Sequence, residues 1–401
     1  MNNIYAALEI GTTRTVLAIG EAETGGRLKV TCHAEIPSTG VRKSQILDIN
    51  QAVQSIRSVL RETEKIQLAA GSSITIGNAF LVVSGQHIKA DPFQGTAQVE
   101  GGKVGNDDIA EVFQASRKMV LARDRELLDI VDQAYGLDNI GGIAAPKGMS
   151  GRILKLDTLQ IHADANRIND ARTAAAGAHL EIREPLFAAT CAAEAVLGDH
   201  EKRNGALVLD IGGGSTGYAV YSDGYLAHVG VIGVGGDHVT NDIAHAFQTT
   251  QAQAEELKTR DASANLAAAE GAEPRVKVPG TSPLMESRTI SRRALNTVVN
   301  ARLRELFGII REKLEEVDLL HRLHAGAVIP GGGAAMRGID ALIPRELGMP
   351  VRTGIPAGID GLAEERHPEA FAAVAGALLY AHRNYEEKSL FQSIFGGFLK
   401  K

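Results

Sequence analysis

The chain has 401 residues, of which 44% are hydrophobic and 22% charged, and its formal net charge is −6. This length fits two or more domains with sizeable cores, and the composition is that of a globular rather than a disordered protein. Nucleic acid is excluded as a main partner because neutralising phosphates requires a basic patch, which the sequence lacks. Cys32 and Cys191 lie far apart and form neither a metal-ligand spacing nor a disulfide framework, which suits a reducing cytoplasm.

Export, membrane spanning and metal binding are not indicated either. The first residues lack a basic segment followed by an apolar one, and no stretch reaches 18 uninterrupted apolar residues. The twelve histidines show no HExxH or paired-ligand spacing. We therefore expect a protein that is neither exported nor membrane-spanning and that has no dedicated transition-metal site.

Residues 5–20 (YAALEIGTTRTVLAIG) and 207–224 (LVLDIGGGSTGYAVYSDG) repeat one pattern. Each has an apolar strand, an acid (Glu9 or Asp210), Ile, Gly, a small-residue turn and a second strand. A strand, not a helix, follows the glycines, which distinguishes both segments from dinucleotide folds and Walker loops. Each is therefore predicted to be a β-hairpin whose backbone N–H groups can close around an anion.

Either hairpin alone could be a plain tight turn, but their repetition predicts a duplicated α/β architecture with a ligand between its halves. The two acids would suit a divalent cation on a polyphosphate, bound largely through water. Residues 326–342 (GAVIPGGGAAMRGIDAL) form a third glycine cluster, in which a strand, a glycine turn and a helix follow one another. A helix N-terminus placed in this way predicts the adenosine side of a nucleotide site.

Two segments are predicted to be insertions. The first, of about 80 residues, contains a helix (NDDIAEVFQASRKMVL) and strand-like runs (ELLDIVDQAYGLD and GRILKLDTLQIHAD), enough for a small α+β module. The second contains a loop-rich stretch with a strand-like centre and a long amphipathic helix (SRRALNTVVNARLRELFGIIREKLEEV).

The tail, SLFQSIFGGFLKK, is predicted to form an amphipathic helix. Its apolar half consists of Leu390, Phe391, Ile394, Phe395, Phe398 and Leu399. The polar run EEK precedes it, and Ser389 with Gln392 forms a capping-box pattern, so a new helix is expected to begin there. Such a helix requires an apolar surface, either a membrane or a groove on its own domain.

The order of these motifs resembles the actin and chaperone-ATPase superfamily. The motifs are the hairpin pair, a predicted helix EPLFAATCAAEAVL, GVGGDHVTNDIA, AEELKTR and PGGGAAMRGID. Within it, GVRKSQILDI, VSGQHI, TNDIAHAF and the tail resemble the FtsA family of bacterial cell-division proteins along essentially the whole chain. The resemblance implies a duplicated actin-like (ribonuclease-H-like) α/β fold with two halves around a nucleotide cleft. It also implies an inserted α+β subdomain that replaces the usual actin one, and a C-terminal amphipathic helix.

The resemblance also implies a division of the chain into five parts. The first core subdomain would comprise 1–84, 163–203 and 370–388, and the second 204–240 and 322–369. Residues 85–162 would form an inserted interaction subdomain, for which a passive insertion is the alternative. Residues 241–321 would form an outer subdomain, and 389–401 a membrane-targeting helix.

The superfamily's ligand contacts can be transferred residue by residue. The nucleotide-binding positions would be Gly11, Thr12, Thr13, Arg14, Gly212, Gly213, Gly214, Ser215, Gly235, Gly236, Glu255, Lys258, Gly331, Gly332, Gly333 and Met336. Asp210 and Glu9 would associate with Mg²⁺, although Glu9 departs from the commoner Asp, and Glu184 would lie near the attacking water. The alternatives are a helix start at Glu184, a solvated pair for Glu255 and Lys258, and core packing for Met336.

The implied function is that of an ATP-binding, actin-like filament former with slow or no hydrolysis. It would tether FtsZ to the inner face of the cytoplasmic membrane at the division site and recruit later division proteins. The FtsZ C-terminal tail would bind the outer subdomain, and the candidate anchors, which could instead be merely solvated, are Arg292, Arg293 and Arg302. The membrane contacts on an anionic surface would be the six apolar tail residues with Lys400 and Lys401. The alternatives are a scaffold like the pilus-assembly protein PilM and a small-molecule kinase of the same superfamily.

Overall fold

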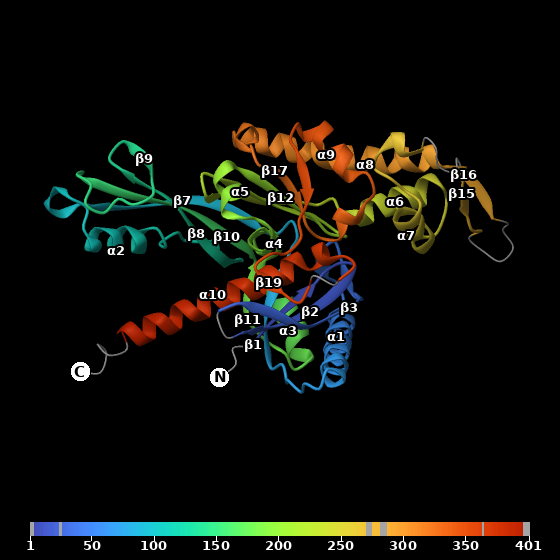
Figure 1. Ribbon diagram of the computed structural model, residues 1–401, viewed down its shortest axis with the longest axis horizontal. Helices are drawn as coiled ribbons and strands as arrows, with labels where there is room; N and C mark the ends of the chain where they lie inside the picture. Colours follow the sequence, from blue (N-terminus) through green and yellow to red (C-terminus); the bar gives the residue numbers. More distant parts are fainter. Residues whose placement is uncertain (1–3, 24–25, 270–274, 281–286, 363–364, 396–401) are drawn as a thin grey trace.

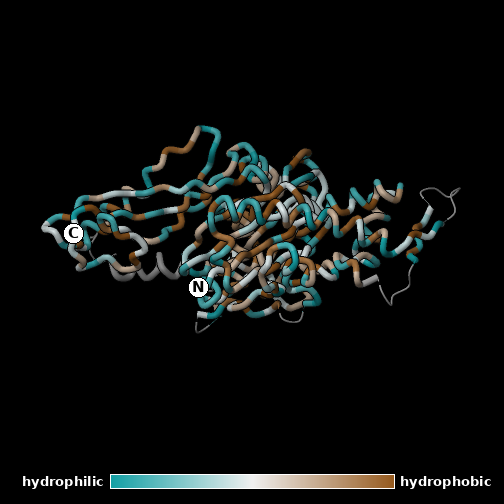
Figure 2. The backbone as a smooth tube through the Cα atoms, turned by 90° about the horizontal axis from the view of Figure 1, so that it is seen from above, coloured by the Kyte–Doolittle hydropathy of each residue, from teal (hydrophilic) through white to brown (hydrophobic). Residues whose placement is uncertain are grey.

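The computed structural model describes the chain except for residues 1–3, 24–25, 270–274, 281–286, 363–364 and 396–401, and describes residues 385–395 by their backbone. The molecule is elongated (Figure 1). Two central sheets lie between an insert that contains α2 (Asn106–Ala115) and a second projecting part. This second part contains α6 (Gly236–Ala246), α7 (Gln251–Arg260), β15 (Arg275–Val278) and β16 (Arg288–Ser291). Figure 2 shows the same elongation from above.

The first central sheet has the strand order β11-β6-β1-β2-β3-β19. β1, β2 and β3 pair antiparallel, whereas β1, β6 and β11 pair parallel. The strands are β1 (Ile4–Ile10), β2 (Arg14–Ala22), β3 (Leu28–Pro37), β6 (Asn78–Val83), β11 (Glu181–Phe187) and β19 (Ile359–Asp360).

The second sheet repeats this plan in the order β14-β13-β12-β17-β18. β12, β13 and β14 pair antiparallel, and β12, β17 and β18 pair parallel. The strands are β12 (Ala206–Ile211), β13 (Thr216–Ser222), β14 (Tyr225–Ile232), β17 (Gly326–Ile329) and β18 (Val351–Thr353). The predicted duplication is confirmed, since β1–β2 and β12–β13 are matching hairpins in matching sheets.

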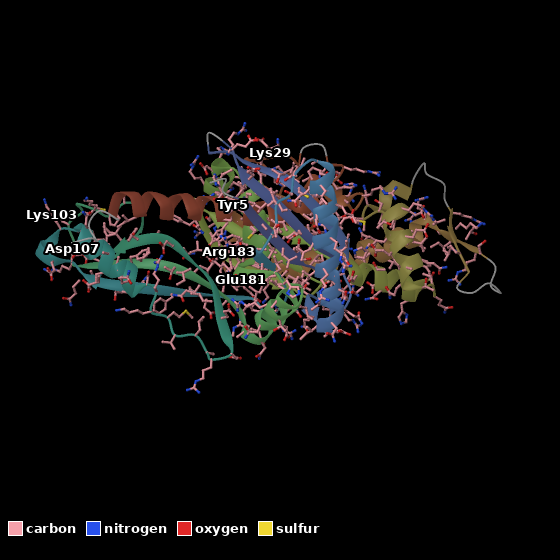
Figure 3. All side chains as sticks on the ribbon, turned by 90° about the horizontal axis from the view of Figure 1, so that it is seen from below. Tyr5, Lys29, Lys103, Asp107, Glu181 and Arg183 are labelled. Carbon is pink, nitrogen blue, oxygen red and sulfur yellow. The ribbon has the colours of Figure 1, made fainter. Side chains whose placement is uncertain are left out.

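Helices α4 (Ala188–Val196) and α10 (Ala372–Phe395) lie between the two sheets and share one apolar core with both. Alanine and glycine make this close packing possible. A Cβ added at Gly376 of α10 would overlap the carbonyl oxygen of Cys191 on α4. Tyr5 of β1 also contacts α10, with its ring centroid 5.8 Å from that of His382 (Figure 3).

The outer faces of the sheets are covered by further helices. Apolar residues of α1 (Ile49–Ala69) and α3 (Ala165–Gly177) pack on the first sheet, and those of α6, α8 (Arg292–Glu316) and α9 (Ile339–Leu347) on the second. Asp48 caps α1 by accepting a hydrogen bond from the Gln51 amide, and Asp164 caps α3 in the same way. The short elements are α5 (Asp199–Asn204), β4 (Val41–Arg42) and β5 (Gln45–Ile46).

The first insert is a four-stranded antiparallel sheet of order β7-β10-β8-β9 with one helix. Its elements are β7 (Lys89–Gln98), α2 (Asn106–Ala115), β8 (Arg125–Leu137), β9 (Ile140–Ile143) and β10 (Ile153–Asp164). Lys103 and Asp107 lie at its far end in Figure 3. The predicted α+β composition is confirmed.

In the second insert, α6 (Gly236–Ala246) packs against both α7 (Gln251–Arg260) and α8. A short hairpin of β15 (Arg275–Val278) and β16 (Arg288–Ser291) precedes α8. The strand-like centre and the long helix expected from the sequence are therefore both present. Val276 and Val278 bury their side chains in the core of the second sheet.

Two local predictions were wrong. Glu184 and Pro185 do not start a helix, because both lie in β11 and the helix begins only at Ala188. β11 is an edge strand of its sheet, where a proline without an N–H group is tolerated. No new helix starts at Ser389, since α10 continues to Phe395. The remaining tail residues, including Phe398, Leu399, Lys400 and Lys401, lie outside the described residues.

Candidate nucleotide cleft

A cleft of about 590 Å³ opens between the two halves, and both hairpins line it. This volume falls in the range of roughly 300–1,000 Å³ that is typical of small-molecule sites. The structure brings together most of the predicted nucleotide and metal positions. The lining includes Glu9, Gly11, Thr12, Thr13, Arg14, Asp210, Gly212, Gly213, Gly214, Ser215, Gly236, Glu255, Lys258, Gly331, Gly332, Gly333 and Met336.

The two hairpins close with the same turn. The amide of Gly11 donates to the carbonyl oxygen of Arg14 over 3.0 Å, and the amide of Gly212 donates to that of Ser215 over 3.0 Å. The intervening residues leave their backbone N–H groups at the end of each hairpin, in the arrangement that favours anion binding. The sequence repeat thus corresponds to a repeat in local geometry.

The hairpins approach each other closely across the cleft. A Cβ added at Gly213 would lie 2.5 Å from Thr13 Cγ2, and one at Gly214 would lie 2.5 Å from Thr12 Oγ1. At Gly214 a Cβ would also lie 2.8 Å from the Lys43 Cα, so the backbone itself leaves no room for a side chain there, whereas at Gly213 the Thr13 side chain would have to move. The glycine run therefore allows two parts of the chain to meet at the site.

Glu9 and Asp210 end the first strands of the two hairpins and face the same cleft. Desolvation raises the pKa of Glu9 to about 7, which the Arg14 charge opposes and the Asp210 charge reinforces. Desolvation likewise raises the pKa of Asp210 to about 6, against the lowering effect of Arg14. Two carboxylates that resist ionisation in this way would be stabilised by an added cation.

This pair of carboxylates fits a Mg²⁺ ion whose other ligands are mostly water molecules and phosphate oxygens. Among the described residues, no group of three or more His, Cys, Asp or Glu side chains could hold a metal. Two carboxylates leave most positions to water and phosphate oxygens, as Mg²⁺ prefers. Asp210 and Glu9 would hold the ion, which would neutralise phosphate charge.

Arg14 lines the cleft but also connects the first hairpin to the short turn, Pro368–Phe371, that precedes α10. Its guanidinium donates to Glu35 at 2.5 Å and to the carbonyl oxygen of Ala370. It also lies 5.5 Å from the centroid of the Phe371 ring. Arg14 was predicted to bind phosphate, and these contacts give it a structural role as well.

The opposite wall comes from the second half. Lys258 and Glu255 of α7 form an ion pair of 2.6 Å, and Lys258 Nζ donates to Thr240 Oγ1 over 2.9 Å. Both residues line the cleft, where the Lys258 side chain is largely buried and that of Glu255 is about half exposed. Lys258 Nζ also donates to the carbonyl oxygen of Gly236 over 3.3 Å. A charged pair held in this way could contact ribose hydroxyls.

The predicted loop before α6 joins the second hairpin through its backbone. Gly236 donates to the carbonyl oxygen of Gly212 over 2.9 Å, and Asp237 donates to that of Gly213 over 2.8 Å. Gly235 lies outside the cleft lining, because it packs against the hairpin backbone and leaves no room for a Cβ. Gly235 therefore supports the site rather than lining it.

The third glycine cluster lines the cleft, although not as the start of a regular helix. A short 3-10 turn, Gly332–Ala335, comes first, and α9 begins only at Ile339. Met336 therefore lies between the turn and α9, not one turn into the helix, and its partly buried side chain lines the cleft. Gly333 lacks space for a Cβ because Ile211 lies against it.

Glu184, which was predicted to lie near the attacking water, is absent from this lining. Glu184 lies in β11, the edge strand that also carries Glu181 and Arg183 (Figure 3). This edge is separated from β3 by β6, β1 and β2. The Tyr380 hydroxyl of α10 donates to Glu184 Oε1 over 3.0 Å. The described geometry thus gives Glu184 a contact with α10.

The proposed partner arginines have different surroundings. Arg302 makes a two-pronged contact with Asp242, at 2.6 and 3.0 Å, and pairs with Glu305. Arg292 donates to the carbonyl oxygen of Asp261, whereas Arg293 is exposed. Arg302 and Arg292 thus contribute to internal contacts within residues 241–321.

Sequence reasoning missed Ser44, Ser84, Arg366 and His367, all of which line the cleft. The two serines lie in GVRKSQILDI and VSGQHI, motifs that carried the family resemblance without a role in the site. No motif marked the segment before α10. This segment, which carries Arg366 and His367, is held beside the third glycine cluster by a long-range contact: the Gly331 amide donates to the carbonyl oxygen of Glu369 over 2.8 Å.

Comparison with known proteins decides the family. The family described as "Cell division protein FtsA" matches residues 207–376, and the one described as "SHS2 domain inserted in FTSA" matches residues 85–162. Cell division protein FtsA of Pseudomonas aeruginosa is 32% identical, covering 94% of this chain and 89% of the relative. The chain belongs to the FtsA family. FtsA of Escherichia coli K12 is 28% identical over 99% of this chain and 96% of the relative.

Solved structures show the actin-like fold that this family membership implies. The PilM-PilN type IV pilus biogenesis complex aligns with a TM-score of 0.64 at 17% identity, covering 94% of this chain and 98% of that one. MreB 5 of Spiroplasma citri bound to AMPPNP aligns with a TM-score of 0.53 at 14% identity, covering 98% of this chain and 99% of that one. The expected duplicated actin-like fold with an inserted subdomain is confirmed.

Proposed function

We propose that this FtsA-family chain binds Mg-ATP between its halves, forms actin-like filaments and tethers FtsZ to the cytoplasmic membrane. It would act on the inner face of the membrane at the division site and recruit later division proteins. The observation that carries the nucleotide proposal is the pair of matching hairpins, which face each other across a cleft with one carboxylate from each half.

The residues of the cleft divide the binding task. Backbone amides of the hairpins bind the phosphates, and Lys258 with Glu255 contacts the ribose. Gly333 and Met336 lie where the base would pack. Because each half supplies one hairpin, bound nucleotide connects the halves and favours the closed subunit that a filament requires.

We expect slow or no hydrolysis. An attacking water must be oriented by a base within hydrogen-bond reach. The carboxylates among the cleft's described lining residues are Glu9, Asp210 and Glu255, and the two hairpin acids are better suited to the metal. Glu184, the sequence candidate for this task, contacts Tyr380 instead. Nucleotide would therefore act mainly by stabilising the assembled state.

Membrane attachment is assigned to the end of α10 and the tail that follows. Among the described residues, no helix is long and apolar enough to span a membrane. In Figure 1, α10 leaves the space between the sheets and extends beyond them. An apolar helical stripe at such an end suits insertion into the interface of an anionic bilayer. The FtsZ tail would bind the outer subdomain, where Arg293 is exposed.

The test combines purified protein with Mg²⁺, anionic or neutral vesicles, and either ATP, ADP or no nucleotide. Filaments on anionic vesicles with ATP, together with capture of an FtsZ C-terminal peptide, are the expected result. Asp210→Ala is the matched control and should fail to assemble. Phosphorylation of a small metabolite would support the kinase instead, and absence of both nucleotide binding and filaments would refute the proposal.

A further inference from the structure

Three serine hydroxyls from separate parts of the chain meet at one end of the cleft. Ser44 Oγ lies 3.1 Å from Ser215 Oγ, and Ser84 Oγ lies 3.3 Å from the same atom. Ser215 belongs to the second hairpin, whereas the other two belong to the first half. All three line the cleft. The cluster is therefore a polar contact between the halves at the ligand site.

The backbone around Ser44 is held in an unusual conformation. Lys43 and Ser44 have φ values of 50° and 58° and form the two-residue turn between β4 and β5. Both central positions of such a turn favour Asn or Gly. The Ser44 amide donates to Thr12 Oγ1 over 2.8 Å, which fixes the turn against the first hairpin. A serine at a position where glycine fits better directs a hydroxyl group towards Ser215 and the cleft.

Ser84 lies between β6 and a glycine that has a positive φ value. It follows β6, whose Val82 also lines the cleft, and precedes Gly85, which has a φ of 128°. It lies directly before the insert, whose first strand starts at Lys89. Its hydroxyl therefore reaches the cleft from the point where the first half leads into the insert.

Hydroxyl groups can donate to phosphate oxygens, and a hydrogen bond to a charged acceptor is stronger than one between neutral hydroxyls. The site for the base is formed by the second half, at α7 and the third glycine cluster. The serines instead lie where both hairpins converge, so the phosphate most distant from the base would come nearest to them.

We infer that Ser44 and Ser84 donate to the terminal phosphate of a nucleoside triphosphate and thereby distinguish a triphosphate from a diphosphate. The terminal phosphate would replace serine–serine contacts with charge-assisted ones and connect both first-half segments to the second hairpin. This inference rests on the proposed nucleotide binding. It goes beyond that proposal by naming Ser44 and Ser84 as the residues through which the terminal phosphate of ATP would stabilise the closed state.

The test measures the dissociation constants of Mg-ATP and Mg-ADP for the full-length protein and for Ser44→Ala, Ser84→Ala and the double variant. We expect the double variant to lose roughly 10- to 100-fold in ATP affinity with ADP affinity changed less than about twofold. Ser84→Thr, which keeps a hydroxyl, should retain most of the discrimination. Ser38→Ala is the control, because Ser38 bonds to Thr15 Oγ1 and does not line the cleft.

Equal losses for ATP and ADP would overturn the inference, because the hydroxyls would then only maintain the shape of the cleft. Unchanged affinities for both nucleotides would also overturn it. Failure of the wild-type protein to bind either nucleotide would refute the proposed function itself, and is distinguishable because it needs no variant. Thermal unfolding of each variant excludes misfolding as the cause of a loss.

Discussion

The hydroxyl of Tyr380, in the middle of α10, donates a hydrogen bond to Glu184 Oε1 over 3.0 Å. This contact joins the central helix to β11, the edge strand of the first sheet. It turns the strongest sequence candidate for a catalytic acid towards a helix that packs between the two sheets. Glu184 is therefore a residue of the interface between α10 and β11.

Glu184→Gln should leave both ATP affinity and any ATP turnover within about twofold of the wild type. The amide can still accept the Tyr380 hydrogen bond, so a fall in stability of at most about 1 kcal/mol is expected. Turnover is measured by phosphate release and affinity by calorimetry. A loss of turnover of tenfold or more at unchanged ATP affinity would return Glu184 to a catalytic role. Tyr380→Phe is the matched variant for the same contact.

Asp129 of β8 is predicted to make stability depend on pH. Desolvation raises its pKa to about 6, and the charges of Glu184 and Asp132 add to this, while its backbone contact and Arg117 oppose it. Since the pKa is about 3.9 in an unfolded chain, ionisation destabilises the folded state fully above pH 6 and not at all below about pH 4. Asp129→Asn should therefore stabilise the protein at pH 8.

The expected gain for Asp129→Asn is about 1–2 kcal/mol at pH 8, reduced from the full shift because the side chain is only partly buried. It should disappear near pH 4. Urea unfolding of both proteins at the two pH values measures it. A gain that is the same at both pH values would show that the substitution acts through packing rather than charge.

Asp210→Ala should weaken Mg-ATP binding by roughly 100-fold, and Glu9→Gln by less than tenfold. The pKa of Glu9 is raised to about 7 and that of Asp210 to about 6, so the neutral side chain of Glu9→Gln resembles a protonated Glu9 that the apo protein populates near pH 7. Asp210 in contrast would carry more of the negative charge that holds the ion. Calorimetry in magnesium measures the ATP affinities of the two variants. In the control with excess EDTA, which removes Mg²⁺, the difference between the two affinities should become smaller. Wild-type affinity of the Asp210 variant in magnesium would exclude the proposed metal site.

The sequence was most informative where function depends on local patterns. The hairpins, with Glu9 and Asp210 at equivalent positions, were predictable because strand alternation and glycine turns are written in consecutive residues. The helix predicted at Glu184 failed because β6 provides a parallel partner from a distant segment, which local patterns cannot reveal. Ser44 and Ser84 were missed for the same reason, since their side chains meet only when two distant segments converge on Ser215 of the second hairpin.

Charge reversal at Arg293 offers the clearest test of the FtsZ contact. Arg293→Glu should weaken capture of the FtsZ C-terminal peptide severalfold and leave ATP affinity and stability unchanged, because the side chain is exposed. Arg292→Glu should weaken it too. Fluorescence anisotropy of the labelled peptide measures the effect. Peptide affinity that is unchanged in the Arg292/Arg293 double variant would remove both from the proposal.

Arg302→Glu differs, because Asp242 would lose its partner and face a like charge. We expect a loss of stability of about 1–3 kcal/mol in addition to any effect on the peptide. Peptide binding by this variant is interpretable only beside its unfolding curve.

The tail should bind membranes weakly as a single copy and strongly as part of a filament. Six buried Leu, Ile and Phe side chains give an upper limit of about 10 kcal/mol, from which helix ordering and incomplete insertion subtract heavily. The continuation of α10 to Phe395 lowers the nucleation cost of the helix, although Gly396 and Gly397 oppose its extension. Lys400 and Lys401 would each add about 1 kcal/mol on anionic lipid.

Truncation after Lys388, and the double substitution Phe391→Asp with Phe395→Asp, should abolish co-sedimentation with anionic vesicles while preserving thermal stability and ATP binding. Contacts that hold α10 in the body, such as those of Tyr380 and Arg383, precede the truncation and are kept. Wild-type protein should pellet more with ATP than with ADP, because neighbouring tails on a filament raise the effective concentration at the bilayer. If the variants still pellet, or if their bodies unfold, the tail belongs to the core rather than to a membrane anchor.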